Sequence, residues 1–220
     1  MKAVLFDLGD TLVKTADMIE CFQRILKAHG IHRTREELTS AHVEAGNLLG
    51  FEFMKTMLDD YWVKRNTIFL EHLRIFGRED LAKIIAEQWW DYSDVAVCSD
   101  VAETLDQLRQ RGLKMGIITN GLQSDFEKII AKTKLNLNFF DVIVTVTTNG
   151  QMKPEQEIFH YALNMLNVAP NEALFVGDTI EYDYEGARKA GLKALLIDRE
   201  GKIVADVEKI RDLREILALI

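Results

Sequence analysis

The sequence of 220 residues is poor in several features that would indicate a specialised protein class. Its only cysteines, Cys21 and Cys98, lie far apart and match no zinc-binding or redox spacing, so we expect reduced thiols in a cytoplasmic protein. No apolar run approaches the length of a membrane span, and the pattern of a signal peptide is missing. Basic residues are outnumbered, 27 against 35 acidic ones, and the net charge of −8 argues against a nucleic-acid or anionic-membrane partner.

What the sequence does contain is an alternation of short apolar runs and helical patterns in residues 1–13 and 97–220. The expected strands are 2–6, 114–118, 141–145, 173–177 and 193–197. The expected helices are 101–110, 125–132, 155–166, 184–190 and an amphipathic helix at 207–219 that packs on the sheet. Such an alternation requires βαβ crossovers, so we predict an α/β fold with a Rossmann-like, doubly wound parallel sheet.

Residues 14–96 have a different pattern, with no convincing strand and with apolar residues at helical spacing, as in Met54, Met57 and Tyr61. We therefore predict two domains. A discontinuous α/β core consists of 1–13 and 97–220, and an all-helical domain of residues 14–96 is inserted after the first strand. An insertion at this point would stand over the end of that strand, where a lid is useful.

Polar residues follow the predicted strands in a regular way. Asp7 ends the first strand, Thr119 follows the second and Asp178 follows the fourth. Lys153 precedes a proline in a loop that leads to a helix. Because open α/β sheets bind ligands at the carboxyl ends of their strands, we expect these side chains to form one site.

The stretches FDLGDTL, IITNG, Lys153-Pro154 and GDTIEYD resemble, in order and spacing, the four motifs of the haloacid dehalogenase superfamily, whose members are mostly phosphohydrolases. The segment 14–96 falls where one large branch of that superfamily carries a helical cap. The resemblance covers essentially the whole chain. It implies a hydrolase in which Asp7 is the nucleophile of a covalent intermediate that water then opens.

The cofactor that the resemblance implies is Mg²⁺, because a carboxylate that attacks a phosphoryl group brings two negative charges together. The expected ligands are oxygens of Asp7, of the Gly9 backbone carbonyl and of Asp178, completed by water and substrate. Asp183 is expected to orient a metal-bound water or to contact Lys153.

The resemblance also implies which residues hold the phosphate group of the substrate. Thr119 supplies a hydroxyl, and Asn120 and Gly121 supply backbone N–H groups just before a helix. Lys153 offsets the negative charge on Asp7 and on the transferring group, which is most of what phosphoryl transfer demands of a protein.

The first motif departs from the usual phosphatase pattern. Phosphatases of the superfamily carry an Asp two residues after the nucleophile, which protonates the leaving oxygen, but here Gly9 stands at that position and Asp10 follows it. One interpretation is that Asp10 reaches the leaving group through an altered turn. Another is that Asp10 is a turn carboxylate that bonds nearby backbone N–H groups. The enzyme then favours good leaving groups such as acyl phosphates or aryl esters, or its reaction is slow or of another type.

The leading functional prediction is a Mg²⁺-dependent phosphohydrolase that acts on a small phosphorylated metabolite through an aspartyl-phosphate on Asp7. One alternative is a 2-haloacid dehalogenase that uses Asp7 on carbon without a metal, and Gly9 is compatible with it. The other is a weakly active or non-catalytic phosphate-binding protein. Asp178 argues for metal and phosphate, because dehalogenases of the superfamily carry uncharged residues there.

Overall fold

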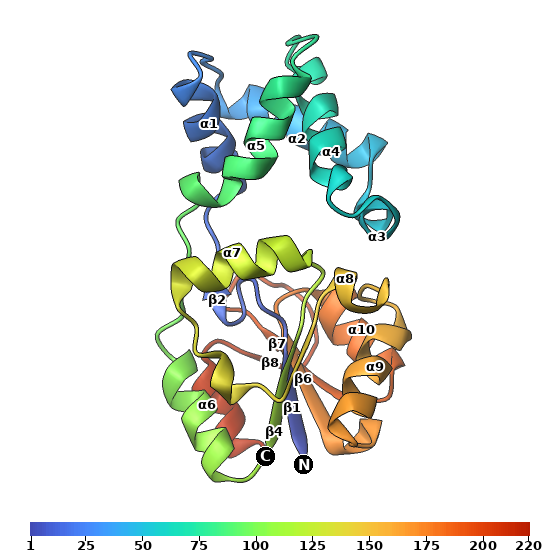
Figure 1. The fold of residues 1–220 in the computed structure, drawn as a ribbon. Helices are drawn as coiled ribbons and strands as arrows, with labels where there is room; N and C mark the ends of the chain where they lie inside the picture. Colours follow the sequence, from blue (N-terminus) through green and yellow to red (C-terminus); the bar gives the residue numbers. More distant parts are fainter.

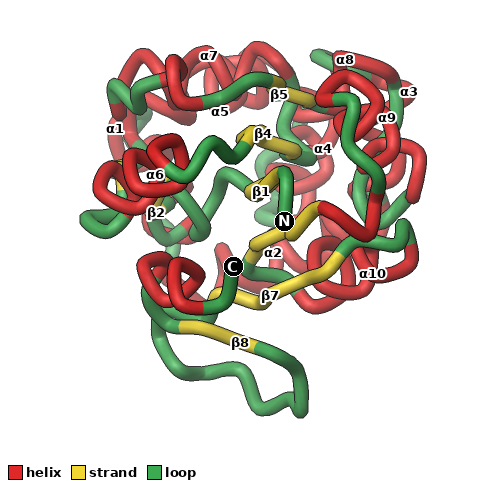
Figure 2. The backbone as a smooth tube through the Cα atoms, turned by 90° about the horizontal axis from the view of Figure 1, so that it is seen from below, coloured by secondary structure: helices red, strands yellow, loops and turns green.

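The computed structural model describes residues 1–220, and a six-stranded parallel sheet lies at its centre (Figure 1). Its strands are β1 (Ala3–Phe6), β4 (Lys114–Ile118), β5 (Val142–Val144), β6 (Ala173–Gly177), β7 (Lys193–Ile197) and β8 (Lys209–Ile210). Their order across the sheet is β5-β4-β1-β6-β7-β8, as Figure 2 shows from below. The strand that comes earliest in the sequence is therefore central, with β4 and β6 on its two sides.

Helices cover both faces of this sheet. They are α6 (Val101–Gln110), α7 (Gln123–Thr133), α9 (Gln156–Leu166) and α10 (Gly186–Lys189), with short 3-10 helices at Leu137–Phe139 and Pro170–Glu172. The short helix α8 (Val146–Asn149) follows β5 and packs against Met54 of the helical segment. Side chains of a strand alternate between faces. Val4 and Phe6 accordingly pack in one cluster with α6 and α7, whereas Ala3 and Leu5 pack in another with α9 and α10. The predicted doubly wound α/β fold is confirmed.

Between β1 and β4 the chain forms a layer of helices that lies beyond the carboxyl ends of the strands (Figure 1). These helices are α1 (Met18–Ala28), α2 (Arg35–Leu48), α3 (Met54–Met57), α4 (Asp60–His72) and α5 (Glu79–Tyr92), with a 3-10 helix at Phe51–Phe53. They have a hydrophobic core of their own, in which the rings of Phe22 and Phe69 stack with centroids 4.1 Å apart. Where the chain enters and leaves this layer, β2 (Val13–Lys14) and β3 (Ala96–Val97) pair in antiparallel fashion.

Two predicted helices are wrong in part. Residues 207–219 do not form an amphipathic helix but the short strand β8 followed by a 3-10 helix at Leu213–Ala218. The apolar residues of this segment have helical spacing, but Ile210 enters the core from a strand at the edge of the sheet, where it pairs with Ile197 of β7. The helix expected at 184–190 begins as a π-helix at Ile180–Glu185 and ends as α10. No helix combines the length and hydrophobicity that crossing a bilayer would need.

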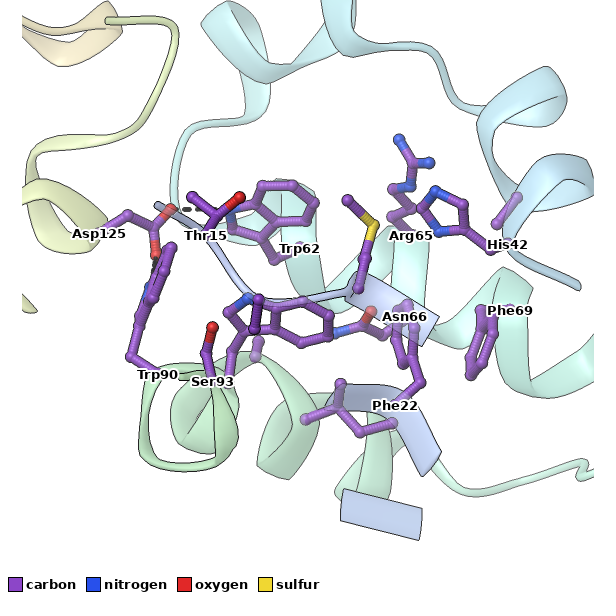
Figure 3. A pocket seen from close by; sticks show the side chains of 16 residues that line it. Thr15, Phe22, His42, Trp62, Arg65, Asn66, Phe69, Trp90, Ser93 and Asp125 are labelled. Carbon is purple, nitrogen blue, oxygen red and sulfur yellow. Dashed lines mark hydrogen bonds between the residues drawn. The ribbon is translucent and has the colours of Figure 1, made fainter. Parts of the chain in front are cut away.

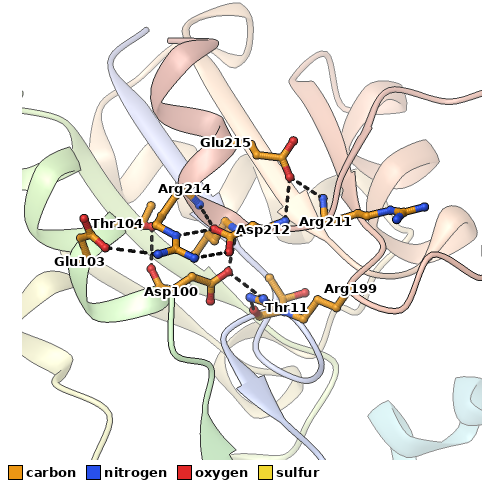
Figure 4. Close-up of polar contacts among 10 residues, drawn as sticks. Thr11, Asp100, Glu103, Thr104, Arg199, Arg211, Asp212, Arg214 and Glu215 are labelled. Carbon is orange, nitrogen blue, oxygen red and sulfur yellow. Dashed lines mark hydrogen bonds and ion pairs between the residues drawn. The ribbon is translucent and has the colours of Figure 1, made fainter.

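A buried polar network joins the loop after β1 to the C-terminal segment (Figure 4). Asp100, at the start of α6, accepts hydrogen bonds on Oδ2 from Arg199 Nη1 at 2.8 Å and from the Leu213 backbone N–H at 2.7 Å. Arg199 Nη2 in turn donates to the Thr11 carbonyl at 2.6 Å. Arg199 therefore holds the loop that follows Asp7, and Asp100 holds both Arg199 and the C-terminal segment.

Candidate active site

The nine site residues predicted from the sequence all line one cleft of about 310 Å³, which we call the strand-end cleft. Asp7 directly follows β1, Thr119 follows β4 and Asp178 follows β6. Because these three strands are neighbours and parallel, their carboxyl ends meet at the same edge of the sheet. Lys153 reaches the cleft from the loop between α8 and α9.

Lys153 is almost completely buried and bridges two carboxylates. Its Nζ donates to Asp7 Oδ1 at 2.5 Å and to Asp183 Oδ1 at 2.6 Å. Burial opposes the charge on this ammonium, but Asp183 and Asp7 outweigh that effect and hold the pKa of Lys153 above its ordinary value. Lys153 therefore carries a fixed positive charge beside the candidate nucleophile. It bonds to Oδ1 of Asp7 and makes no hydrogen bond to the other carboxylate oxygen, Oδ2.

Asn120 holds the backbone of Lys153 rather than presenting its side chain to a ligand. Its Oδ1 accepts from the Lys153 backbone N–H at 2.7 Å, and its Nδ2 donates to the Lys153 carbonyl at 2.9 Å. The Gly121 N–H, predicted to bind phosphate, donates to Thr119 Oγ1 at 3.2 Å. Of the donors in this loop, the Thr119 hydroxyl proton and the backbone N–H groups of Asn120 and Leu122 make no hydrogen bond within the protein.

Asp183 is fixed by Lys153, as one interpretation of the sequence predicted, and by Thr179, which sequence reasoning did not identify. Its Oδ2 accepts from the Thr179 backbone N–H at 2.9 Å and from Thr179 Oγ1 at 2.6 Å, while Oδ1 accepts from Lys153. A Cβ on Gly177 would lie 2.4 Å from Asp183 Cγ, so only glycine lets this carboxylate approach the end of β6. Of the two roles expected for Asp183, the contact with Lys153 is the one that the geometry contains.

Three carboxylates gather at the point where a metal ion is expected. One carboxylate oxygen from each of Asp7, Asp178 and Asp183 lies within 4.8 Å of the others. Burial, followed by the nearby charges of Asp7 and Asp183, raises the pKa of Asp178 to about 8. Burial raises the pKa of Asp7 to about 6, against the opposing effect of Lys153. This all-oxygen donor set fits a hard divalent cation such as Mg²⁺, which would relieve the crowding of negative charge.

The turn that carries Gly9 and Asp10 is unusual. Asp10 has a left-handed backbone with φ of 48°, and its carboxylate accepts from the Thr15 backbone N–H at 2.9 Å and from Thr15 Oγ1. The carboxylate therefore ties together the turn and the start of the connection to α1. The Gly9 carbonyl accepts from the Thr11 N–H at 2.6 Å, which leaves it one lone pair for a metal ion.

The helical layer closes over the strand-end cleft through contacts that the sequence did not predict. Asp125 on α7 accepts two indole hydrogen bonds, from Trp62 of α4 at 2.9 Å and from Trp90 of α5 at 2.7 Å (Figure 3). Nearby, Lys55 of α3 forms an ion pair with Glu155, just before α9. These aromatic residues occur among many others in a helical segment, and nothing in their spacing distinguishes them.

Comparison with known proteins places these features in a family context. The family described as "Haloacid dehalogenase-like hydrolase" matches residues 4–197. A glyceraldehyde 3-phosphate phosphatase of Methanopyrus kandleri is 32% identical over 215 residues, which cover 92% of this chain and 85% of that protein. Among solved structures, a HAD phosphatase from Thermococcus onnurineus has a TM-score of 0.68 at 27% identity, covering 100% of this chain and 97% of that one. A 2-haloacid dehalogenase from Pseudomonas syringae pv. tomato has a TM-score of 0.73 at 25% identity with the same coverage.

Proposed function

Because the chain belongs to the haloacid dehalogenase-like hydrolases, we propose that it is a Mg²⁺-dependent phosphohydrolase that forms an aspartyl-phosphate on Asp7. The observation that carries this proposal is the pairing of Asp7 with Lys153 beside a second, part-buried carboxylate, Asp178. Similarity to the glyceraldehyde 3-phosphate phosphatase supports a small phosphorylated substrate. The helices α1–α5 would act as a cap over the site.

In the first step of the proposed reaction, Asp7 Oδ2 attacks phosphorus and the bond to the ester oxygen breaks. Lys153 holds the other oxygen of Asp7, so the carboxylate cannot rotate away from this line of attack. Thr119 and the Asn120 N–H donate to the oxygens of the phosphoryl group, whose charge they help to disperse. In the second step water attacks the same phosphorus, which releases phosphate and restores the Asp7 carboxylate.

Asp7, Asp178 and the Gly9 carbonyl would hold the metal ion, with Asp183 acting through Lys153 and Thr179. When bound, Mg²⁺ supplies charge neutralisation between the nucleophile and the phosphoryl group. Gly9 offers no proton to the leaving oxygen, so that proton comes from solvent or from Asp10.

The test of this proposal uses acetyl phosphate and the variant Asp7→Asn. The amide is a much weaker nucleophile, so turnover should fall to background while circular dichroism stays unchanged. Asp91→Asn, at an exposed position on α5, is the matched control and should retain full activity. Chelator should abolish wild-type turnover and Mg²⁺ should restore it. Turnover by Asp7→Asn at the wild-type rate would refute the mechanism.

The same experiment separates phosphatase from dehalogenase activity. Release of chloride from 2-chloropropionate, undiminished by chelator and lost in Asp7→Asn, would identify attack on carbon instead of phosphorus. Phosphate release that requires Mg²⁺, without chloride release, is the result expected from the acidic cluster.

A further inference from the structure

A second cavity, of about 190 Å³, lies among the helices α1, α2, α4 and α5 (Figure 3). Its walls are mostly hydrophobic, with Met18, Phe22, Phe69, Ile85 and Trp89 among the residues that line it. None of these side chains takes part in the proposed reaction. We call this space the cap cavity.

Two of the polar side chains around the cap cavity form hydrogen bonds within the protein. Arg65 Nη1 donates to Tyr61 Oη at 3.0 Å, and Asn66 Nδ2 donates to the Ala82 carbonyl at 3.2 Å. Burial, followed by the nearby charge of Arg65, lowers the pKa of His42, which favours the neutral form of its ring. An occupant of this space would meet mainly carbon, and the main exception is the buried guanidinium of Arg65, which makes no ion pair.

The cap cavity and the strand-end cleft share a wall. Thr15, Trp62, Trp90 and Asp125 line both spaces. Because Asp125 accepts the N–H groups of both indoles, the polar edges of Trp62 and Trp90 are satisfied where the two spaces meet. A molecule with a phosphate in the cleft would have to pass this wall to place a further part in the cap cavity.

We propose that the cap cavity binds the apolar part of the substrate, so that the preferred substrates are phosphate monoesters of medium-length or aromatic alcohols. The proposal rests on the phosphatase function proposed above. An apolar cavity of about 150 Å³ can hold benzene, so a space of 190 Å³ accommodates a chain or ring of about six carbons. The enzyme would then favour substrates whose hydrocarbon part gains the most free energy when it moves from water into the cavity.

The kinetic test compares ethyl, butyl and hexyl phosphate. Each buried methylene should raise kcat/KM about three- to fourfold, so hexyl phosphate, with four more methylenes, should exceed ethyl phosphate by about 80- to 250-fold in the wild type. In Ala86→Phe the new ring occupies the cavity, and this ratio should fall to nearly one. The ratio is taken within each variant and does not depend on how active that variant is.

The matched control is Lys83→Phe, which places the same ring on the exposed side of α5 and should keep the wild-type ratio. A wild-type ratio near one, or an unchanged ratio in Ala86→Phe, would overturn the proposal. Absence of hydrolysis of every ester and of acetyl phosphate would instead refute the phosphatase function.

A binding test is independent of catalysis. All three tryptophans of the chain, Trp62, Trp89 and Trp90, line the cap cavity, so their fluorescence reports on its contents. Titration with 1-hexanol, which does not absorb at the excitation wavelength, should shift the emission to the blue in wild type and in Lys83→Phe but not in Ala86→Phe. No response in the wild type would show that the cavity does not bind apolar groups.

Discussion

The balance of charge around Lys153 governs the site at the scale of single residues. Three carboxylates, those of Asp7, Asp178 and Asp183, lie near this one ammonium, which leaves two negative charges uncompensated when all are ionised. A divalent cation would balance them. Burial, followed by the negative charges of Asp7 and Asp183, raises the pKa of Asp178 to about 8 in the absence of a metal ion.

This imbalance predicts a pH dependence of stability. The pKa of Asp178 is higher in the folded protein than the ordinary 3.8, so the metal-free protein should lose stability as pH rises from about 4 to about 8. Mg²⁺ competes with protons for the same oxygens, so it should raise Tm more at about pH 9 than at about pH 6. Calorimetry with and without Mg²⁺ at the two pH values measures the difference.

Asp178→Asn is the control for that prediction. The amide cannot ionise, so this variant should be more stable than the metal-free wild type at about pH 9, by roughly 2–4 °C for each kcal/mol relieved. Its Tm should respond little to Mg²⁺. An equal effect of Mg²⁺ on the Tm of wild type and variant would show that Asp178 is not a ligand.

The exchange of Gly9 and Asp10 gives a second prediction at this scale. A Cβ on Gly9 would meet only Thr15 Cγ2, at 3.6 Å, and glycine suits the left-handed backbone of residue 10. The double variant Gly9→Asp with Asp10→Gly should therefore fold, although it loses the hydrogen bonds to Thr15. If the new carboxylate acts as general acid, alkyl phosphate hydrolysis should rise about 10²-fold, with little gain for acetyl phosphate.

Asp10→Asn separates the two interpretations of this residue. As a carboxylate that fixes Thr15, Asp10 should be replaceable by Asn with little change in the rates for any ester. A loss of about 10²-fold or more, confined to alkyl esters, would identify Asp10 as the general acid.

At the scale of elements, the Asp125 carboxylate of α7 binds both α4 and α5 through the two indole N–H groups. Asp125→Asn leaves one amide oxygen for the two indoles, so one N–H loses its acceptor. We expect the free energy of unfolding to fall by about 1–2 kcal/mol, and the indole protons of Trp62 and Trp90 to exchange faster in NMR spectra.

Asp59→Asn is the control at the same interface. The exposed Asp59 accepts one hydrogen bond from Ser124 at 3.2 Å, and its replacement should cost less than about 0.5 kcal/mol. Equal losses of unfolding free energy in Asp125→Asn and Asp59→Asn would mean that the two indole hydrogen bonds stabilise this interface no more than the bond from Ser124.

Strands and helices with a strong local pattern of apolar residues could be predicted from the sequence, and those without one could not. The strands β1 and β6 are continuous apolar runs buried on both faces, so they could be located from sequence, and parallel topology then placed Asp7 and Asp178 together. By contrast, β8 has only two residues, and it is a strand because it pairs with the edge of β7. The contacts of Asn120 with Lys153 and of Asp125 with two indoles join distant segments through side chains, which no local pattern encodes.

At the scale of the whole molecule, Asp100 and its partner Arg199 connect the loop after β1 with the C-terminal segment. Asp100→Asn should weaken its bonds to Arg199 and Leu213 and lower the free energy of unfolding by about 1.5–3 kcal/mol, as for hydrogen bonds to charged groups. Urea denaturation measures this. Glu103→Gln, which alters an exposed ion pair with Arg214 at 3.7 Å, should change stability by less than about 1 kcal/mol. A result for Asp100→Asn as small as that for Glu103→Gln would contradict the role of the network.

The central position of β1 has a consequence for synthesis on the ribosome. Ala3 pairs with Lys114 on one side and with Ala173 on the other, so both neighbours of this strand are made much later than the strand itself. At a synthesis rate of about 5–20 residues per second, β1 remains unpaired for roughly 5–20 s before β4 is made, and β6 is made later still. During that time α1–α5 can already form, because their contacts are local in sequence. The nascent chain therefore carries an unpaired apolar segment beside finished helices, and this interval is when it is most exposed to aggregation.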